Sequence, residues 1–190
     1  MSSTGGALTA KALLLVDLSV EQATRSVVSD KMLENIAALI QASCFQLIID
    51  SRLTFNAEST SSLACMYPNI GRVDKNDGAK LHPYIDDIMR NVETPHLHLP
   101  KYQYSCFFES TLDNELRSHN IQSVFLVGVN TDFCILATAL DSFYRRYKTF
   151  IVEDCCSSIG GSDAHNQGVK AIKKFLGNDC IIHSSSLSVV

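Results

Sequence analysis

The hydrophobic positions of the chain fall into two alternating patterns. Short apolar stretches, which are typical of strands, cover residues 11–18, 45–50, 95–101, 123–129, 149–154 and 180–183. Longer segments with apolar residues every three or four positions, which are typical of helices, cover residues 30–43, 79–91, 110–119, 132–147 and 162–176. Strands that alternate with helices predict an α/β fold, in which helices cover both faces of a parallel sheet.

The strand stretches differ in how far they are expected to be buried. Four of them, LLLVD, FQLIID, SVFLVG and TFIVED, lack polar alternation, which is typical of central strands covered on both faces. The stretch at residues 95–101 does alternate, with His96 and His98 on one side, and its Pro100 is tolerated only where no ladder hydrogen bond is required. We therefore place that strand at or near an edge, and we expect residues 51–78 to form a long polar loop.

Length and composition predict a single domain. The 190 residues, 46% of them apolar, suffice for one core, so residues 1–190 are expected to form one domain with residues 1–9 as a loose tail. The net charge of -4 and the lack of a Lys/Arg cluster argue against nucleic-acid and anionic-membrane partners. The longest apolar run, residues 12–16, is too short to span a bilayer, and residues 1–11 lack the order of a signal peptide.

The cysteine content points to a reducing compartment. The seven cysteines are Cys44, Cys65, Cys106, Cys134, Cys155, Cys156 and Cys180, and none of them forms a Cys-x-x-Cys pair. We therefore expect a cytoplasmic protein in which most of these thiols are buried and inert. The adjacent pair Cys155-Cys156 is expected to pack at a strand end.

Chemically useful side chains follow several of the predicted strands. In open parallel sheets, functional sites form beyond the carboxyl ends of the strands. In this chain those ends carry Asp17, Asp50, Lys101, the turn at residues 130–134 and Asp154. We expect an acid, a base and a thiol to meet at this rim of the sheet.

Cys134 has a physical reason to be reactive. It follows a strand and lies in the first turn of a predicted helix, with Thr131 or Asp132 as the expected N-cap. Unpaired amides and the helix dipole favour an anion there, which lowers the pKa of a thiol and offers donors to an oxyanion. The alternative is a buried cysteine that only packs, which is the commoner role of this residue type.

Lys101 and Asp17 each have a plain alternative as well. Lys101 at the end of an apolar strand is by itself most simply a solvated lysine. Asp17 follows four apolar residues and either caps a turn or faces a functional site. The second alternative arises because strand-end acids in this architecture often face the site.

Several segments occur together in an order and spacing that match one known family. They are ALLLVDLSVEQ with Asp17, GAKLHPYI, KYQYSCFFESTLDNEL with Lys101, and GVNTDFCILATALDSFYRRY followed by IVEDCCSS with Cys134. From about residue 11 to residue 176, the chain resembles the isochorismatase-like cysteine hydrolases, whose members include N-carbamoylsarcosine amidohydrolase and nicotinamidase relatives.

The resemblance implies a fold and a set of site residues. The fold is a three-layer αβα arrangement around a six-stranded, mostly parallel sheet. The catalytic residues are Asp17, Lys101 and Cys134. A cis peptide bond between Val129 and Asn130 turns the Asn130 and Cys134 amides toward the substrate oxygen.

The same resemblance implies a mechanism without a cofactor. Asp17 takes the thiol proton and later passes it to the leaving amine, while Lys101 holds positive charge nearby. Cys134 attacks a carbonyl and forms an acyl-enzyme that water hydrolyses. The substrate is a small molecule, and a homo-oligomer is expected because such assemblies are common among soluble enzymes and in this family.

Arg52 marks a departure from the family nicotinamidases. The nicotinamidases of this family have an Asp-x-His pattern with a further histidine nearby, and these residues bind a metal. In this chain the matching stretch is Asp50-Ser51-Arg52. A guanidinium has no lone pair to offer a metal, so we expect no metal site and no nicotinamidase activity. Arg52 either pairs with a substrate carboxylate or forms a surface salt bridge.

The retained thiol narrows the expected reaction. Isochorismatases proper typically lack this cysteine, so Cys134 favours C–N hydrolysis of an amide, carbamoyl or ureido compound. Phe133 and Phe107 lie close in sequence to the three catalytic candidates and either wall an apolar pocket or fill core.

Three other functions compete with this one. A non-catalytic or effector-like family member that binds a metabolite or partner has no need of Asp17, Lys101 and Cys134 together. Isochorismatase or nicotinamidase activity conflicts with the retained thiol and the missing histidine. A flavodoxin-like nucleotide binder conflicts with the absence of glycine after the first strand.

Overall fold

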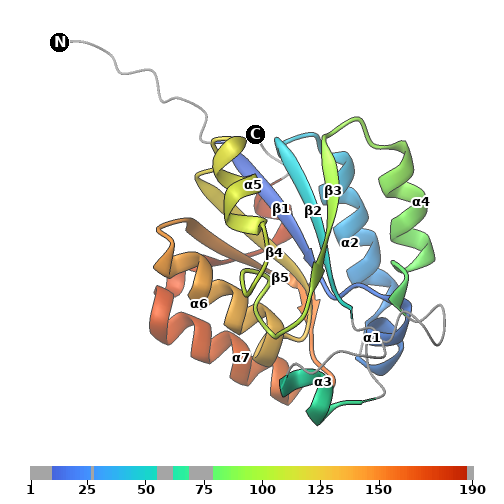
Figure 1. The fold of residues 1–190 in the computed structure, drawn as a ribbon, viewed down its shortest axis with the longest axis vertical. Coiled ribbons are helices and arrows are strands. Elements are labelled where there is room, and N and C mark those ends of the chain that lie inside the picture. Colours follow the sequence, from blue (N-terminus) through green and yellow to red (C-terminus); the bar gives the residue numbers. More distant parts are fainter. Residues whose placement is uncertain (1–9, 27, 55–61, 69–78, 188–190) are drawn as a thin grey trace.

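The computed structural model of the protein describes residues 10–26, 28–54, 62–68 and 79–187. Its sheet has six strands in the order β3-β2-β1-β4-β5-β6, and every neighbouring pair is parallel (Figure 1). The strands are β1 (Lys11–Val16), β2 (Leu47–Leu53), β3 (His96–Lys101), β4 (Ser123–Val129), β5 (Lys148–Ser157) and β6 (Ile181–Ile182). The parallel α/β fold is therefore confirmed, and β3 lies at an edge of the sheet as predicted.

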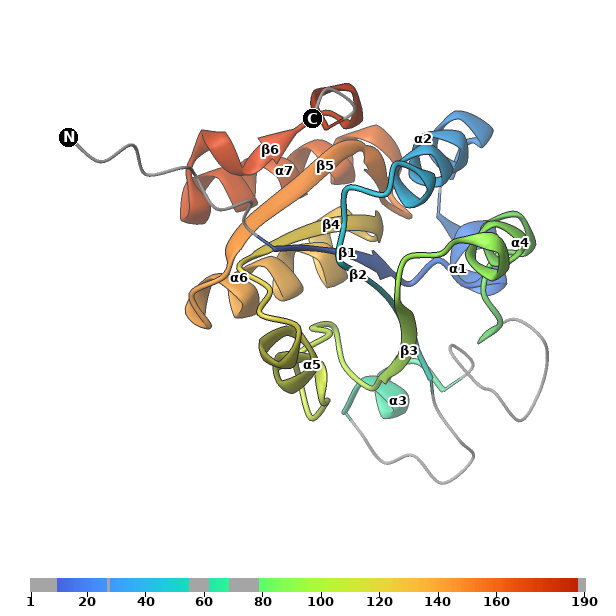
Figure 2. The same cartoon turned by 90° about the horizontal axis from the view of Figure 1, so that it is seen from above.

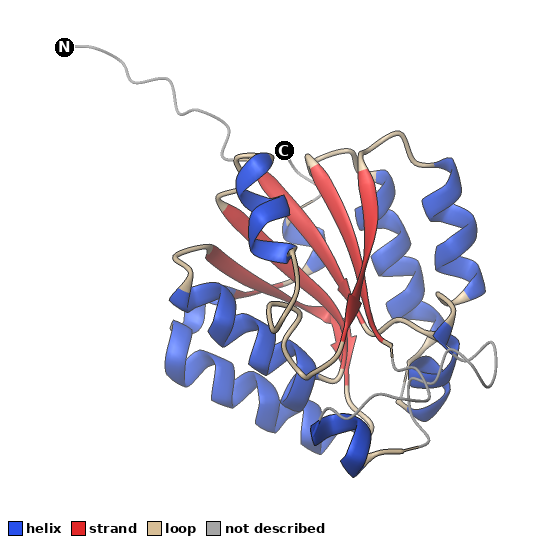
Figure 3. Cartoon of the chain, in the orientation of Figure 1, coloured by secondary structure: helices blue, strands red, loops and turns tan. Residues whose placement is uncertain are grey.

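Helices cover both faces of this sheet, as Figures 2 and 3 show. They are α1 (Val20–Arg25), α2 (Asp30–Gln41), α3 (Ser62–Met66), α4 (Pro83–Asn91), α5 (Leu112–Ser118), α6 (Leu136–Tyr144) and α7 (Gly161–Leu176). A π-helical turn (Thr131–Ile135) precedes α6, and two short 3-10 turns (Asn178–Cys180 and Ser184–Ser186) flank β6.

The continuous apolar strands supply two cores, because successive side chains point to opposite faces of a sheet. Leu13 and Leu15 of β1 pack in a cluster with residues of α2 and α4. Leu14 and Val16 pack in a second cluster with residues of α5, α6 and α7. A strand buried on both faces therefore needs no polar alternation, which explains the sequence pattern.

Several element boundaries differ from the sequence-based expectation. Strand β2 continues to Leu53, and α1 and α3 were not predicted. The predicted helix at residues 132–147 begins as the π-helical turn and ends at Tyr144, and β5 continues to Ser157. The expected tail at residues 1–9 and most of the expected loop, at residues 55–61 and 69–78, lie outside the described residues.

Candidate active site

Three candidate side chains meet at the carboxyl ends of β1, β3 and β4. Asp17 directly follows β1, Lys101 is the last residue of β3, and Cys134 lies in the π-helical turn after β4. The Lys101 Nζ atom is 2.6 Å from Asp17 Oδ2 and 3.4 Å from Cys134 Sγ. The residues are 0%, 2% and 7% exposed for Lys101, Asp17 and Cys134, respectively. The predicted cluster of acid, base and thiol therefore forms in the interior rather than at the surface.

Asp17 is held in a fixed orientation by the end of the neighbouring strand. Its Oδ1 accepts a 2.6 Å hydrogen bond from the Leu53 amide, and its own amide donates to Ser51 O at 2.9 Å. The φ angle of Asp17 is +52°, in the left-handed region that few residues other than glycine adopt. Such conformations persist where surrounding contacts hold them, and here those contacts leave Oδ2 facing Lys101.

Lys101 is a buried cation whose donors are all engaged. Besides Asp17 and Cys134, its Nζ donates to Gln103 O at 3.1 Å. Burial disfavours the charge, but the Asp17 carboxylate and then Cys134 outweigh it and raise the pKa of Lys101. Lys101 therefore stays protonated, and the alternative of a solvated lysine is wrong.

Cys134 differs electrostatically from the sequence-based expectation. Burial raises the pKa of its thiol, and the Asp17 carboxylate raises it further, while only Lys101 opposes them. The raised pKa favours the neutral thiol, which donates a hydrogen bond to Asp17. Burial therefore opposes the lowering of the thiol pKa that a helix start predicts, and a low pKa for Cys134 stays a prediction.

The turn that carries Cys134 is fastened to its neighbours. No side chain caps the start of the turn by a hydrogen bond. Instead, the Thr131 amide donates to Ser158 Oγ at 3.1 Å, and the Thr131 hydroxyl donates to Ser157 O at 3.1 Å. The N-cap is Asn130, not Thr131 or Asp132. Gly168 of α7 lies so close that a Cβ there would be 2.7 Å from the Asp132 amide nitrogen, so only glycine permits this packing.

Asn130 links the turn to the cavity mouth. The Val129–Asn130 peptide is cis, as the family resemblance implied. The Asn130 side-chain oxygen accepts hydrogen bonds from Ser26 Oγ and from the Ile159 amide, each at 2.8 Å. Val129 itself is fully buried in the core, so its side chain does not line the cavity.

A cavity of about 120 Å³ opens onto Cys134. Its described lining consists of Asp17, Gln22, Arg25, Leu53, Leu63, Tyr67, Tyr104, Asn130, Phe133, Cys134 and Ile159. Phe133 stacks on Tyr104 with ring centroids 5.7 Å apart, as expected of a wall residue. The volume is far below the roughly 300–1,000 Å³ of pockets that hold drug-sized ligands, so the space suits a small molecule.

Some lining residues were not identified from the sequence. Gln22 and Arg25 belong to α1, and Leu63 belongs to α3, both of them short helices within poorly patterned sequence. One signal existed, because Ser19 and Gln22 have the spacing of a helix capping box. Ser19 Oγ does accept the Gln22 amide at 3.2 Å.

Phe107 does not take the role that was considered for it. It is 5% exposed, belongs to the core and stacks on Tyr147 at 6.1 Å. Arg145 lies over its ring at 4.8 Å from the centroid. Of the two alternatives for Phe107, the structure therefore shows the core-filling one, since Phe107 is not among the described residues that line the Cys134 cavity.

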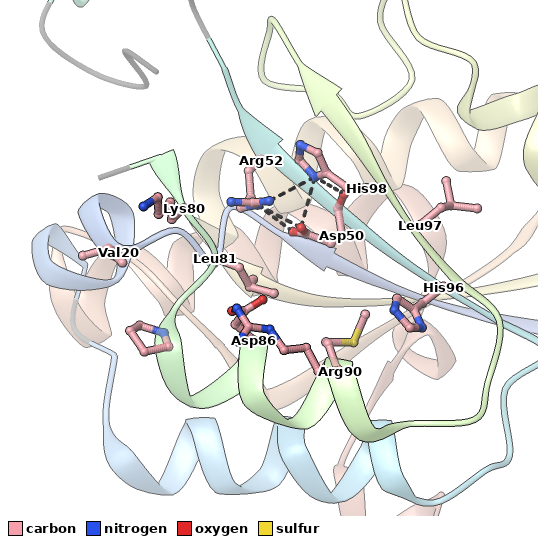
Figure 4. Close-up of a pocket in the computed structure, with 12 residues that line it drawn as sticks. Val20, Asp50, Arg52, Lys80, Leu81, Asp86, Arg90, His96, Leu97 and His98 are labelled. Atoms are coloured by element: carbon pink, nitrogen blue, oxygen red, sulfur yellow. Dashed lines mark hydrogen bonds and ion pairs between the residues drawn. The ribbon is translucent and has the colours of Figure 1, made fainter. Parts of the chain in front are cut away.

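Arg52 lies in a different cavity, of about 560 Å³, beside β2, β3 and α4 (Figure 4). Its Nε donates to both Asp50 carboxylate oxygens at 3.0 and 2.9 Å, and its guanidinium also contacts Ala79 O and His98 Nδ1 at 2.5 and 3.3 Å. Arg52 is therefore part of an internal ion pair, and it does not line the Cys134 cavity. Of the two alternatives for Arg52, the structure shows a salt bridge, although its two side chains are only 13% and 6% exposed rather than on the surface.

The Asp50 cluster does not fit a metal ion. Arg52 and His98 already engage the Asp50 carboxylate, and a guanidinium offers no lone pair. Among the described residues, no three His, Cys, Asp or Glu side chains gather in a way that would hold a metal. We therefore assign no metal ion to the Asp50 cluster.

Asp154 also lies away from the Cys134 cavity. Because β5 continues to Ser157, Asp154 sits within the strand and accepts hydrogen bonds from Asn35 Nδ2 and the Ser184 amide at 2.9 and 2.8 Å. The prediction that Asp50 and Asp154 share the rim with Asp17 is therefore wrong.

The remaining expectations concern disulfides and membranes. None of the seven cysteines is in a disulfide, and Cys155 and Cys156 are buried as predicted. Within residues 10–26, 28–54, 62–68 and 79–187, no helix combines the length and the apolar character needed to cross a bilayer.

Comparison with known proteins places these features in a family context. The model of the isochorismatase domain matches residues 11–178. Curated relatives include the ureidoacrylate amidohydrolase RutB of Variovorax paradoxus, 34% identical over 79 residues, which are 42% of this chain and 31% of that protein. RutB of Acinetobacter baylyi is 33% identical over 79 residues, 42% of this chain and 32% of the relative. The matched stretch thus spans about a third of the length of these relatives.

Solved structures share the fold at low sequence identity. A cysteine hydrolase from Pseudomonas syringae pv. phaseolicola has a TM-score of 0.82 at 17% identity, covering 96% of this chain and 92% of that one. The nicotinamidase PncA of Bacillus subtilis has a TM-score of 0.77 at 17% identity, covering 92% and 100%. N-carbamoylsarcosine amidase from Thermoplasma acidophilum has a TM-score of 0.72 at 20% identity, covering 93% and 97%.

Proposed function

The chain belongs to the isochorismatase domain family, and on that premise we propose that it is a cysteine hydrolase. The proposed reaction is hydrolysis of a C–N bond in a small amide, carbamoyl or ureido compound, through an acyl-enzyme on Cys134. The observation that carries this proposal is the buried contact of Lys101 with both Asp17 and Cys134 at the floor of a small cavity.

The first half of the reaction forms the acyl-enzyme. Asp17 accepts the Cys134 proton along the hydrogen bond between them, so the thiolate arises only as it attacks the carbonyl carbon. A high resting pKa suits this order, because the acid and the nucleophile exchange one proton within a water-poor site. The Asn130 and Cys134 amides are the proposed donors to the oxyanion.

The second half returns the site to its starting state. Collapse of the tetrahedral intermediate breaks the C–N bond, and Asp17 gives the proton to the leaving amine. Asp17 then takes a proton from the water that attacks the thioester and passes it to the Cys134 sulfur as the C–S bond breaks, which restores the thiol. Lys101 remains protonated throughout and holds its positive charge beside Asp17 and Cys134.

Two further observations support the reaction class. The cavity volume of about 120 Å³ limits the substrate to a small molecule. The names of the relatives, ureidoacrylate amidohydrolase and N-carbamoylsarcosine amidase, describe hydrolysis at carbamoyl nitrogen in those proteins. A cytoplasmic location and a homo-oligomeric state are part of the same proposal, and light scattering of the purified protein tests the second.

The proposal is tested by ammonia release. A panel of amides, carbamoyl amines and ureido acids is incubated with the wild-type protein and with Cys134→Ala, and Cys65→Ala serves as a matched control at an exposed thiol. We expect the first variant to lose at least about a thousandfold in kcat and the second to match wild type. Full activity of Cys134→Ala would contradict covalent catalysis, and silence across the panel would favour a binding protein.

A further inference from the structure

Helix α1 borders the Cys134 cavity with two polar side chains. Gln22 and Arg25 are three positions apart, so they share one face of the helix, and both line the cavity. The helix begins three residues after Asp17, and Figure 1 shows it at the end of the sheet where β1 finishes. The geometry of α1 is therefore tied directly to the strand end that carries the proposed acid.

Arg25 brings the cavity a positive charge that the proposed chemistry does not use. Among the described residues that line the cavity, it is the only Lys or Arg. Lys101 is fully buried beneath the cavity and is neutralised by Asp17 at 2.6 Å. A ligand in the cavity therefore meets both the Cys134 thiol and the Arg25 guanidinium of α1.

Among the described residues, the ion pair of Arg25 with Glu21 leaves most of the Arg25 donors available. Its Nη2 is 3.4 Å from Glu21 Oε1 one helical turn earlier, and the two side chains are 42% and 15% exposed. This contact engages one nitrogen of a guanidinium that has five N–H donors in a fork that matches a carboxylate. The Gln22 amide, on the same face, is a second donor that lines the cavity.

Apart from Asp17 and Arg25, the described residues that line the cavity carry no charge. Phe133 and Tyr104 stack on each other, and Leu53 and Leu63 add apolar surface. Burial, together with a hydrogen bond to Tyr67, raises the pKa of Tyr104 to about 12, so this ring stays neutral near pH 7. The cavity is thus lined by the proposed nucleophile, by apolar side chains and by the Arg25 cation.

We propose that Arg25, with Gln22 beside it, binds a carboxylate of the substrate, so that the substrate is a small carbamoyl or ureido carboxylic acid. This inference rests on the proposed function, because it needs Cys134 at the reactive end. A neutral aromatic amide would leave the Arg25 guanidinium with Glu21 as its anionic partner and would not use its other donors. Arg25 is in this sense a specificity-determining residue rather than part of the catalytic group.

A pair of alkylating reagents tests the inference without knowledge of the substrate. Iodoacetate and iodoacetamide are similar in size and differ in charge, and the exposed Cys65 thiol is an internal reference. We expect Arg25→Gln to lower the iodoacetate-to-iodoacetamide rate ratio at Cys134, relative to Cys65, about tenfold. Glu21→Gln removes the partner but keeps the guanidinium, so its ratio should equal or exceed that of wild type. An unchanged ratio in Arg25→Gln overturns the inference.

Steady-state kinetics tests it with substrates. N-carbamoyl amino acids are compared with their primary amides, which lack the negative charge. We expect Arg25→Gln to raise KM for the acids about ten- to a hundredfold, with kcat nearly unchanged, and to leave KM for the amides within about twofold. Arg25→Lys should retain part of the preference because it keeps the charge but loses the fork. An equal rise in KM for acids and amides overturns the inference.

The two proposals fail in different ways. Turnover that survives Cys134→Ala contradicts the proposed function itself. Turnover that needs Cys134 but shows no dependence on Arg25 and no preference for acids contradicts only the inference about the substrate.

Discussion

Two buried carboxylates on neighbouring strands have been put to different uses. Asp17 after β1 pairs with Lys101 at 2.6 Å, and Asp50 of β2 pairs with Arg52 at 2.9 Å. Both acids are almost fully buried, and both cations come from nearby strand ends. The first pair contacts a candidate nucleophile, since Lys101 Nζ lies 3.4 Å from Cys134 Sγ. The second pair instead contacts His98 Nδ1 and the Ala79 carbonyl oxygen through Arg52.

The difference shows that a buried ion pair does not by itself indicate catalysis. The Asp17 pair is a candidate for catalysis because the Cys134 thiol hydrogen-bonds to the Asp17 carboxylate and because a cavity reaches both residues. The Asp50 pair has a larger cavity beside it, yet both of its carboxylate oxygens accept hydrogen bonds from the Arg52 guanidinium. The contact partners of the acid, rather than its burial or the cavity volume, separate the two.

The largest expected effect comes from removing each acid in turn. Asp17→Asn deletes the proton acceptor of Cys134, and we expect kcat/KM for ammonia release to fall about a hundred- to ten-thousandfold. Asp50→Asn should keep kcat/KM within about threefold of wild type, because Asp50 does not contact the thiol. Equal losses in the two variants would show that both ion pairs act on the reaction.

Removal of each cation compares the pairs through stability. Lys101→Met leaves a nearly inaccessible carboxylate without its cation, and we expect the free energy of unfolding in urea to fall by about 3–5 kcal/mol. Arg52→Met should cost less, about 1–3 kcal/mol, because His98 stays within hydrogen-bond distance of Asp50. A larger loss in Arg52→Met would mean that the Asp50 pair is the main electrostatic support of the sheet.

Alkaline pH should destabilise the fold, in part through the thiol of Cys134 and in part through other buried thiols such as Cys155 and Cys156. The folded pKa of Cys134 lies above its unfolded value, so above about pH 8.5 the unfolded chain releases a proton that the folded chain keeps. Stability therefore falls as pH rises, by about 1.4 kcal/mol per unit for each such thiol. Urea unfolding at pH 7.5, 8.5 and 9.5 measures this slope, which Cys134→Ser should reduce and Arg52→Met should not. An identical slope in Cys134→Ser would contradict the raised pKa.

The smallest effect concerns two aromatic rings close in sequence to the three catalytic candidates. Phe133→Leu removes a cavity wall that stacks on Tyr104, so KM should rise about three- to tenfold with little change in stability. Phe107→Leu alters the core instead, which should cost about 1 kcal/mol of stability and leave KM unchanged. Steady-state kinetics and urea unfolding of both variants test these two expectations. A raised KM in Phe107→Leu would show that the Phe107 ring affects substrate binding.

Much of the fold was predictable because hydrophobic periodicity is local. The runs in β1, β2, β4 and β5 follow from burial on both faces, and the alternation around His96 and His98 follows from the edge position of β3. Helices α1 and α3 escaped prediction because five or six residues are too few to show a helical period. The contribution of Arg25 to the cavity was hidden for the same reason.

By itself, the sequence determined the order of strands and helices and, through motifs that resemble those of the isochorismatase-like hydrolases, the three candidates Asp17, Lys101 and Cys134. Only the tertiary structure decided their states. It buried Lys101, which alone would be a solvated lysine, and raised the pKa of Cys134, which a helix start alone would lower. It also turned Arg52 toward Asp50 and Phe107 into the core. The physical reason is that desolvation and charge pairing depend on neighbours from other strands, and strand order, not chain distance, brings those neighbours together.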